Sequence, residues 1–384
     1  MQPSSILVII LALVLFLGAF ILIKTMLFTR KSSTAIIPFE YGIPRFKQDP
    51  QTLAEHLSSV IQIETISHED PKKDKKENLK KMQEQLASLY PLVHKNLTKE
   101  VVDGFSLIYT WKGSNPDLNP VVFMAHQDVV PADEHTLDQW TYPPFSGKIA
   151  DGFIWGRGTL DIKSQVIAIL ESVEALLAAK YKPERTVILT FSHNEEVLGT
   201  GAKAVVDHLK DQGIRVDAVI DEGGAIYDGI IPGIKGLSAS VGIAEKGYLS
   251  LKLTVKGTGG HSSTPPKETA IGILSKAIAR LERQKFPTDV RMVKPMFQGL
   301  ASAASPVMQM AFGNLWLFGG IVTKILSSKN ETDATIRTTV APTIIQSGVK
   351  DNVLPSLAEA VVNFRILPGQ SIADVCDYVR FVIK

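Results

Sequence analysis

This 384-residue chain has little cysteine and almost no excess of charge of either sign. The single cysteine, Cys376, excludes an intrachain disulfide and a thiolate metal site, so any metal must be held by histidine and carboxylate ligands. Lys and Arg number 41 against 39 for Asp and Glu, and a net charge of +2 offers no basic field to a phosphate backbone. We therefore expect no nucleic acid partner.

The chain also lacks internal repeats and low-complexity tracts. Its 45% hydrophobic and 21% charged residues exclude intrinsic disorder, a collagen-like repeat and a multi-span membrane protein. About 350 residues remain after an N-terminal segment, which is more than one hydrophobic core usually spans. Two domains are expected.

The N-terminal segment, residues 1–31, contains an uninterrupted apolar stretch over residues 6–23, close to the ~20 residues that cross a bilayer. It is either a signal peptide or an uncleaved anchor, since no Lys or Arg precedes it. The basic residues after it favour a cytosolic chain, whereas the glycosylation sequons at Asn96 and Asn330 require the secretory lumen. Together these features predict a secreted glycoprotein, with a membrane anchor or association with lipid particles as the alternative.

Strand-like and helix-like segments alternate in the region that we assign to a catalytic domain, residues 32–240. Apolar runs of strand type alternate with segments of helical periodicity. The strands are expected at 121–125, 186–192 and 218–221, and the helices at 164–179 and 201–210. This order predicts an α/β fold with a mostly parallel sheet and helices on both faces.

A smaller α+β domain is expected over residues 241–384. Its strands are predicted at 247–255 and 359–366, and its helices at 269–283 and 371–384. Between them, residues 295–328 are strongly apolar. They are either core with an inserted helix pair or an apolar wall for an acyl chain or a partner.

Histidine and acidic residues follow the predicted strands of the first domain, where ligands gather in parallel sheets. They are His126, Asp128, Asp161, Glu195, Glu196, Asp221 and Glu222. Two zinc ions that share a carboxylate require about seven donors, including water. Each cluster alone has a plainer structural reading, but their convergence at successive strand ends predicts a pair of metals.

The residue types also suggest how the work is divided. Asp128 can accept the second imidazole N–H of His126 and fix its tautomer. Asp161 can bridge two cations. One of the adjacent Glu195 and Glu196 can bind metal while the other remains free as a base.

Five motifs together resemble the co-catalytic zinc exopeptidases of the carboxypeptidase S and aminoacylase family, the M20 peptidases. The similarity runs from about residue 50 to the end, and residues 266–269 and 363–365 share features with the secreted N-fatty-acyl-amino-acid synthase/hydrolase branch. The five motifs are residues 126–131, 156–161, 195–201, 221–223 and 260–265.

The resemblance implies a role for each candidate residue. His126 and Glu222 would hold one zinc, with Asp221 as the alternative to Glu222, and Glu196 would hold the other. Asp161 would bridge the two ions, Glu195 would accept a proton from the attacking water, and Asp128 would support His126.

The smaller domain would be a lid that pairs two subunits into a homodimer. Its His261 would reach the partner's site and stabilise the oxyanion. Asn352 and Arg365 would contact substrate, because a guanidinium holds a carboxylate well. Arg365 could equally be an exposed strand residue.

The chain departs from the family in one respect. In the family a second catalytic segment follows the lid and supplies the last zinc histidine, whereas the eight histidines here end at His261. The catalytic domain therefore reads as C-terminally truncated. We expect an unpaired sheet edge, a weakly held zinc beside Glu196 and little hydrolysis by this chain alone.

The expected function of the complete protein is zinc-dependent, reversible hydrolysis and synthesis of N-fatty-acyl amino acids from a fatty acid and an amino acid. A carboxypeptidase or dipeptidase acting on short peptides is the first alternative. A dimerising or lipid-carrying protein without catalysis is the second.

Overall fold

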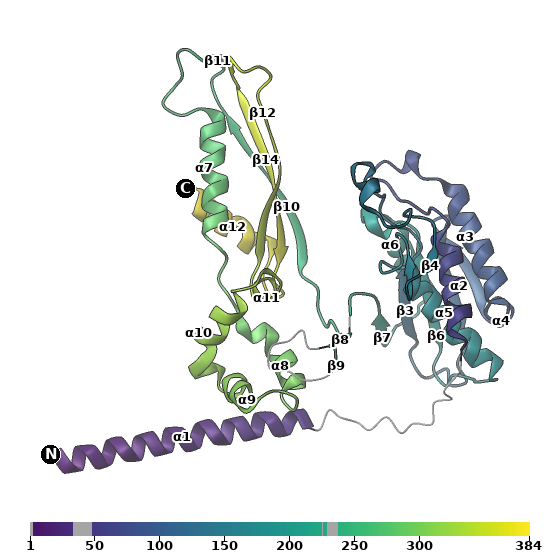
Figure 1. Cartoon of the computed structure of the whole chain (residues 1–384), viewed down its shortest axis with the longest axis horizontal. Helices are drawn as coiled ribbons and strands as arrows, with labels where there is room; N and C mark the ends of the chain where they lie inside the picture. Colours follow the sequence, from purple (N-terminus) through teal and green to yellow (C-terminus); the bar gives the residue numbers. More distant parts are fainter. Residues whose placement is uncertain (1–2, 34–47, 225, 229–236) are drawn as a thin grey trace. The chain divides into compact units, whose positions relative to one another are not determined.

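The structure of the chain is a computed structural model that describes residues 3–33, 48–224, 226–228 and 237–384. It forms two compact units (Figure 1). The α/β unit is Tyr41–Gly223, and the second unit comprises Met1–Glu40 and Gly224–Lys384. The predicted α/β class with a smaller α+β part is confirmed.

The α/β unit is built on a five-stranded sheet. Its strand order is β1-β2-β6-β3-β7, with β3 parallel to β6 and β7, and with the β1–β2 and β2–β6 pairs antiparallel. The strands are β1 (Thr98–Val102), β2 (Ser106–Trp111), β3 (Val121–His126), β6 (Val187–Ser192) and β7 (Ala218–Ile220). The three strands predicted here are present, and the antiparallel β1 and β2 make the sheet mixed.

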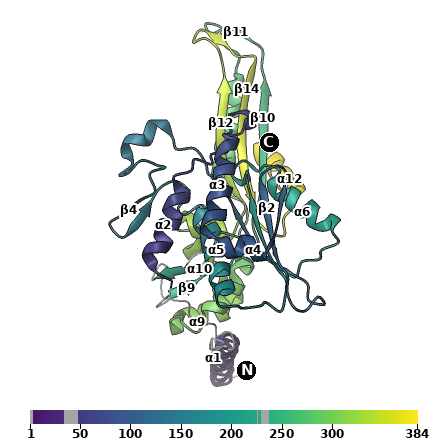
Figure 2. The ribbon, with the colours of Figure 1, turned by 90° about the vertical axis from the view of Figure 1, so that its right-hand side faces the viewer.

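Helices cover both faces of this sheet, as the sequence predicts. On one face lie α2 (Pro50–Ile61), α3 (Lys76–Leu89), α4 (Pro91–Asn96) and α5 (Lys163–Ala178), and on the other lies α6 (Gly201–Asp211). Leu170 of α5 packs with Phe191 in the larger core, whereas Leu209 of α6 packs with Val122 in the smaller one. In Figure 2, α2 and α6 lie to either side of β2.

The edge of the sheet is β7, which pairs only with β3 among the described residues. Val219 is 56% exposed and Ile220 is 48% exposed. This strand therefore carries two exposed apolar side chains. A small hairpin, β4 (Lys148–Ala150) with β5 (Phe153–Trp155), lies outside the sheet.

The second unit contains an antiparallel sheet of order β10-β14-β12. Leu281, Phe364 and Val375 share one core, which joins this sheet to two helices. The strands are β10 (Gly247–Lys256), β12 (Thr339–Ser347) and β14 (Leu357–Ile366), and the helices are α7 (Ala270–Arg283) and α12 (Ile372–Ile383). Only β12 was not predicted. The short pairs are β11 (Gly260–His261) with β13 (Val353–Leu354), and β8 (Ile226–Asp228) with β9 (Leu237–Ala239).

The apolar region 295–328 forms helices, three rather than the expected pair. Phe297 and Phe312 stack with their ring centroids 3.9 Å apart and form a separate core that also buries Phe28 of the N-terminal helix. The helices are α1 (Pro3–Ser33), α8 (Lys294–Leu300), α9 (Pro306–Gly313) and α10 (Leu315–Leu326), followed by α11 (Asn330–Thr335). α1 packs against α8 and α9.

Candidate metal centre

Three neighbouring strands deliver the candidate ligands. His126 is the last residue of β3, Glu195 lies three residues beyond the end of β6, and Glu222 lies two residues beyond the end of β7. Because β3, β6 and β7 are parallel, their carboxyl ends meet at one edge of the sheet. Asp161 joins them from the loop that precedes α5.

These side chains converge on the buried imidazole of His126. Its Nε2 lies 3.1 Å from Asp161 Oδ1, 3.6 Å from Glu222 Oε2 and 3.8 Å from Glu195 Oε2. Ligand atoms within 4.8 Å of one another form two overlapping sets, His126 with Asp161 and Glu196, and His126 with Glu195 and Glu222. The donors are one imidazole and four carboxylates, which suit a pair of divalent cations.

Asp128 is buried and positions the loop that carries two of these carboxylates. Its Oδ1 accepts the backbone N–H of Glu195 at 3.0 Å, and its Oδ2 accepts that of Glu196 at 3.1 Å. Ser67 Oγ donates to the same carboxylate at 2.6 Å. His126 Nδ1 lies 2.9 Å from the backbone oxygen of Asp128 and 3.4 Å from its carboxylate. The backbone oxygen, rather than the predicted carboxylate, is the nearer acceptor for the imidazole.

The turn that carries Asp161 is held by a residue that sequence reasoning missed. Lys163 is fully buried, and its Nζ donates to Val60 O at 2.9 Å and to Ile63 O at 2.6 Å. Burial lowers the pKa of Lys163 to about 7. Its backbone N–H bonds Gly158 O at 2.9 Å, which closes the turn around Asp161.

Burial and mutual repulsion perturb the protonation of the cluster. Burial raises the pKa of Glu222 to about 7, and although His126 opposes this rise, Asp161 and Glu195 add to it. Burial raises the pKa of Glu195 and Glu196 in the same way. For His126, burial would lower the pKa, but the hydrogen bond and charge of Asp128, together with Glu222, raise it to about 10. Cations can replace the protons that these groups share.

Two further residues of the α/β unit, His193 and Asp221, belong to neither ligand set. His193 Nδ1 lies 2.8 Å from Ser106 Oγ. Asp221 is exposed and belongs to neither ligand set, whereas Glu222 belongs to one of them.

The other predicted site residues belong to the second unit. His261, on β11, is exposed, and its Nδ1 lies 2.9 Å from Ser263 Oγ. Asn352 accepts the backbone N–H of Ser262 at 3.1 Å, and its side-chain Oδ1 is buried without a hydrogen-bond partner among the described residues. The guanidinium of Arg365 lies 4.7 Å from the ring centroid of Tyr248. The roles of these residues stay predictions.

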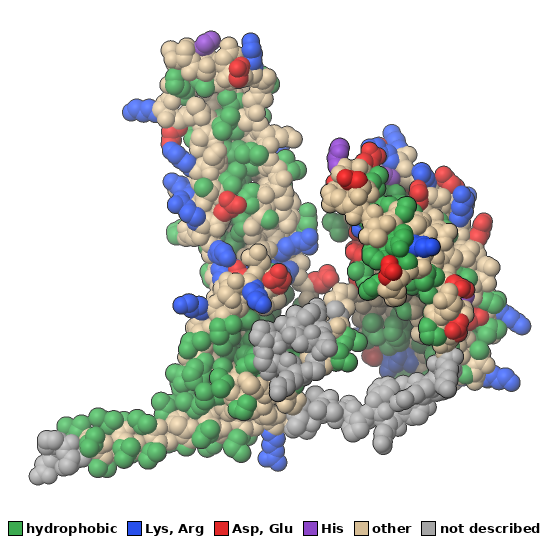
Figure 3. Space-filling view, in the orientation of Figure 1, with side chains coloured by type: hydrophobic (Ala, Val, Ile, Leu, Met, Phe, Trp, Pro, Cys, Tyr) green, Lys and Arg blue, Asp and Glu red, His purple; other side chains and the backbone are tan. Residues whose placement is uncertain are grey.

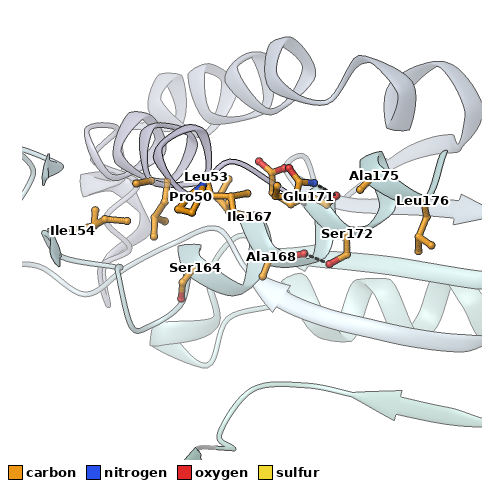
Figure 4. Close-up of a pocket in the computed structure, with 13 residues that line it drawn as sticks. Pro50, Leu53, Ile154, Ser164, Ile167, Ala168, Glu171, Ser172, Ala175 and Leu176 are labelled. Carbon is orange, nitrogen blue, oxygen red and sulfur yellow. Dashed lines mark hydrogen bonds between the residues drawn. The ribbon is translucent and has the colours of Figure 1, made fainter. Parts of the chain in front are cut away.

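A pocket of about 640 Å³ lies between α2 and α5 and contains none of the candidate ligands (Figure 4). Its walls are mostly apolar, with Leu53 and Ile167 among them. The carboxylate of Glu171 lines it and is occupied, because it pairs with His56 and accepts the hydroxyl of Tyr90 at 3.0 Å. The pocket is thus separate from the metal centre.

Comparisons with known proteins identify the family of this chain. Residues 122–332 match the profile of a family described as "Peptidase family M20/M25/M40". The chain is 42% identical over 337 residues to the probable carboxypeptidase S-like 2 of Dictyostelium discoideum, covering 86% of this chain and 64% of that protein. It is 39% identical over 341 residues to the N-fatty-acyl-amino acid synthase/hydrolase PM20D1 of Homo sapiens, covering 88% and 67%. The chain belongs to the M20 peptidase family.

Solved structures of the M20 family share the fold. The M20 family metallo-carboxypeptidase Sso-CP2 from Sulfolobus solfataricus has a TM-score of 0.59 at 18% identity, covering 88% of this chain and 75% of that chain. Human carnosine dipeptidase 1 has a TM-score of 0.54 at 16% identity, covering 87% and 73%. The chain spans 64% and 66% of the length of two curated relatives, the Dictyostelium protein and the Xenopus tropicalis PM20D1.

Metal binding should release protons and weaken in acid. Ions bind the deprotonated ligands, whereas Glu222 has a pKa of about 7 and His126 one of about 10 in the metal-free site. We expect the zinc affinity to fall about tenfold per displaced proton for each pH unit below 7. Calorimetric titration in buffers of different ionisation enthalpy measures the released protons. His208→Ala is the control, because it removes an acid-paired histidine outside the cluster and should leave the zinc affinity and its pH dependence unchanged. A zinc affinity that does not vary with pH, with no proton release, would contradict the assignment.

Gly158→Ala should weaken metal binding. Gly158 has φ +88°, and a Cβ there would lie 2.7 Å from Val129 Cγ1, so the turn that carries Asp161 must shift. Gly152→Ala is the control, because Gly152 has φ +79° with open space around it. We expect both to cost about 1 kcal/mol of stability from backbone strain, measured by urea unfolding. Only Gly158→Ala should lower zinc affinity, and equal affinities would refute the coupling.

Proposed function

We propose that this protein is a metal-dependent amidohydrolase that cleaves, and in reverse forms, the amide bond of N-fatty-acyl amino acids. The observation that carries the proposal is the convergence of Asp161, Glu195, Glu196 and Glu222 on the buried His126. The proposed cofactor is a pair of zinc ions. Such ions polarise an amide carbonyl and acidify water when they are bound.

The residues of the cluster have different proposed roles in metal binding and proton transfer. His126 and Glu222 would hold one ion, Glu196 would hold the other, and Asp161 would contribute to both. Glu195 remains as the base that accepts a proton from the attacking water and returns it to the leaving amine. Its raised pKa, caused by burial and neighbouring acids, favours both transfers.

The substrate class rests on the relatives. Several of them are named N-fatty-acyl-amino acid synthase/hydrolase, at 38–40% identity. Hydrolysis and synthesis are two directions of one reaction, because water attack on the amide and amine attack on the acid pass through the same tetrahedral intermediate. The same Glu195 would therefore serve both directions.

The second unit supports the proposal of a homodimer with shared sites. Arg365 pairs with Tyr248 near one end of β10, and β10 runs eight residues further to Lys256 before β11 carries His261. At 3.3 Å per residue, the stretch from Tyr248 to Lys256 is about 26 Å long, so Arg365 lies near the end of β10 opposite the one that leads to His261. A small amide cannot span that distance, so we propose that each site takes His261 and Asn352 from one subunit and Arg365 from the other.

We further propose that the chain enters the secretory pathway. The N-terminal helix is apolar over Ile6–Arg30 and long enough to cross a membrane, a property that signal sequences share. Asn96 and Asn330 of the two sequons are exposed, as glycosylation requires.

Glu195→Gln in the complete protein should reduce turnover at least about a thousandfold and leave zinc content unchanged, because a general base is lost while the ligands stay. Glu196→Gln is the matched variant, since it should lower zinc content itself. Amide hydrolysis and metal analysis by mass spectrometry measure the two effects. Unchanged turnover in Glu195→Gln would show that Glu195 is not the general base.

The carboxypeptidase reading is kept as the second function, because the chain is also 34% identical to carboxypeptidase S of Saccharomyces cerevisiae. A series of N-acyl amino acids from acetyl to oleoyl separates the two activities. The proposed function predicts a kcat/KM that rises by roughly threefold or more for each pair of added methylenes until the acyl site is filled. A preference for acetyl groups or short peptides would favour the carboxypeptidase.

A further inference from the structure

The C-terminal third of α1 is built into the second unit. Asn314 is fully buried, and its Nδ2 donates to Ile21 O at 3.2 Å and to Thr25 Oγ1 at 3.0 Å. Beside it, a Cβ on Gly313 would lie 3.1 Å from Thr25 Cα, so the two helices are in close contact. Phe28 is only 7% exposed within the α8–α10 core.

A leader that is cut off has no need of such contacts. Removing α1 would uncover Phe297 and Phe312, whose core includes Phe28. It would also take away two of the three acceptors of the Asn314 amide, leaving Met310 O. Losing these two hydrogen bonds and exposing the aromatic core are both unfavourable, so the second unit as described depends on α1.

The N-terminal part of α1 is not buried by the other helices. Its side chains are exposed and apolar from Ile6 to Phe16, and Figure 3 shows hydrophobic side chains along this helix and over the helices beside it. The segment from Ile6 to Lys24 is about 28 Å long at 1.5 Å per residue, close to the ~30 Å hydrocarbon core of a bilayer.

Aromatic and basic side chains mark the end of that span. The Phe20 and Trp316 rings lie 5.9 Å apart, and Lys24 Nζ lies 5.2 Å from the Phe20 centroid and 5.8 Å from that of Trp316. Tryptophan and lysine concentrate where hydrocarbon meets head groups. This cluster is formed by α1 and α10 together, so α10 begins close to the end of the apolar part of α1.

α10 exposes an apolar stripe from that point onward. Leu317, Ile321 and Ile325 follow one another at intervals of four residues, which places them on one face, and they are 45%, 61% and 64% exposed. Lys324 lies beside this stripe with an exposed side chain that can reach the head groups.

We propose that α1 is retained as a bilayer anchor and that α10 lies in the adjoining lipid interface, with the Leu317, Ile321 and Ile325 face turned to the acyl chains. The partner is a bilayer rather than a second copy, because the stripe continues the surface of α1, which is itself long enough to span one. The inference goes beyond the proposed function and does not depend on the metal centre.

Retention of α1 is tested on the full chain, expressed in eukaryotic cells and isolated from membranes. Mass spectrometry of a tryptic digest should detect the peptide that ends at Lys24, and the chain should remain in the pellet after carbonate extraction. A mature chain that begins after Arg30 would overturn the proposal.

The position of α10 is tested with an environment-sensitive fluorophore on Ile321→Cys in a Cys376→Ser background, reconstituted in phosphatidylcholine and phosphatidylserine vesicles. Spin-labelled acyl chains should quench its emission about twofold, as expected for a side chain buried in the interface. Asp377→Cys, on the exposed surface of α12, is the control and should keep its emission. Emission from Ile321→Cys that the lipid does not quench, or disulfide dimers through Ile321→Cys, would show water or a second copy on this face.

Discussion

The candidate centre depends on one buried carboxylate. Asp128 makes three hydrogen bonds to two separate parts of the chain, since it accepts the backbone N–H groups of Glu195 and Glu196 and the hydroxyl of Ser67. Its backbone oxygen is within hydrogen-bond distance of His126. The α/β unit thereby orients an imidazole and a pair of adjacent glutamates through a single residue. Charge-assisted hydrogen bonds to a buried carboxylate are strong, and this makes the geometry stiff.

A stiff cluster of acids is unfavourable without cations. The carboxylates around His126 repel one another, and burial raises the pKa of Glu195, Glu196 and Glu222. In the metal-free site protons offset part of this repulsion, and divalent ions can take over that role. Interactions in the surrounding fold offset the unfavourable free energy of assembling the cluster. One of them is the fully buried Lys163, which ties the start of α5 to the end of α2. Affinity for metal and stability of the fold are therefore linked.

The second unit combines an antiparallel sheet that carries polar candidate residues with a group of apolar helices around α1. Its antiparallel sheet places Arg365 near one end of β10 and the His261 loop beyond the other end. Its helical part instead gathers apolar surface around α1, with Phe28 at the centre of a small core. Membrane attachment through this part would hold the protein where fatty acyl substrates partition. The proposed chemistry and the proposed location are thus compatible, although each stands on its own contacts.

The strands β3, β6 and β7 could be predicted from the sequence, because buried parallel strands appear as short apolar runs. The candidate ligands could be predicted too, since they follow the ends of those strands. The sequence also contains Asp103-Gly104, a dipeptide typical of hairpins, and both residues have positive φ in the loop between β1 and β2. Three findings came from the folded structure alone: Lys163 is a buried clamp, the backbone oxygen of Asp128 is nearest the imidazole, and α1 packs on α8 and α9. Those facts depend on contacts between residues far apart in the chain, and a local pattern of apolar and polar residues does not encode which distant groups meet.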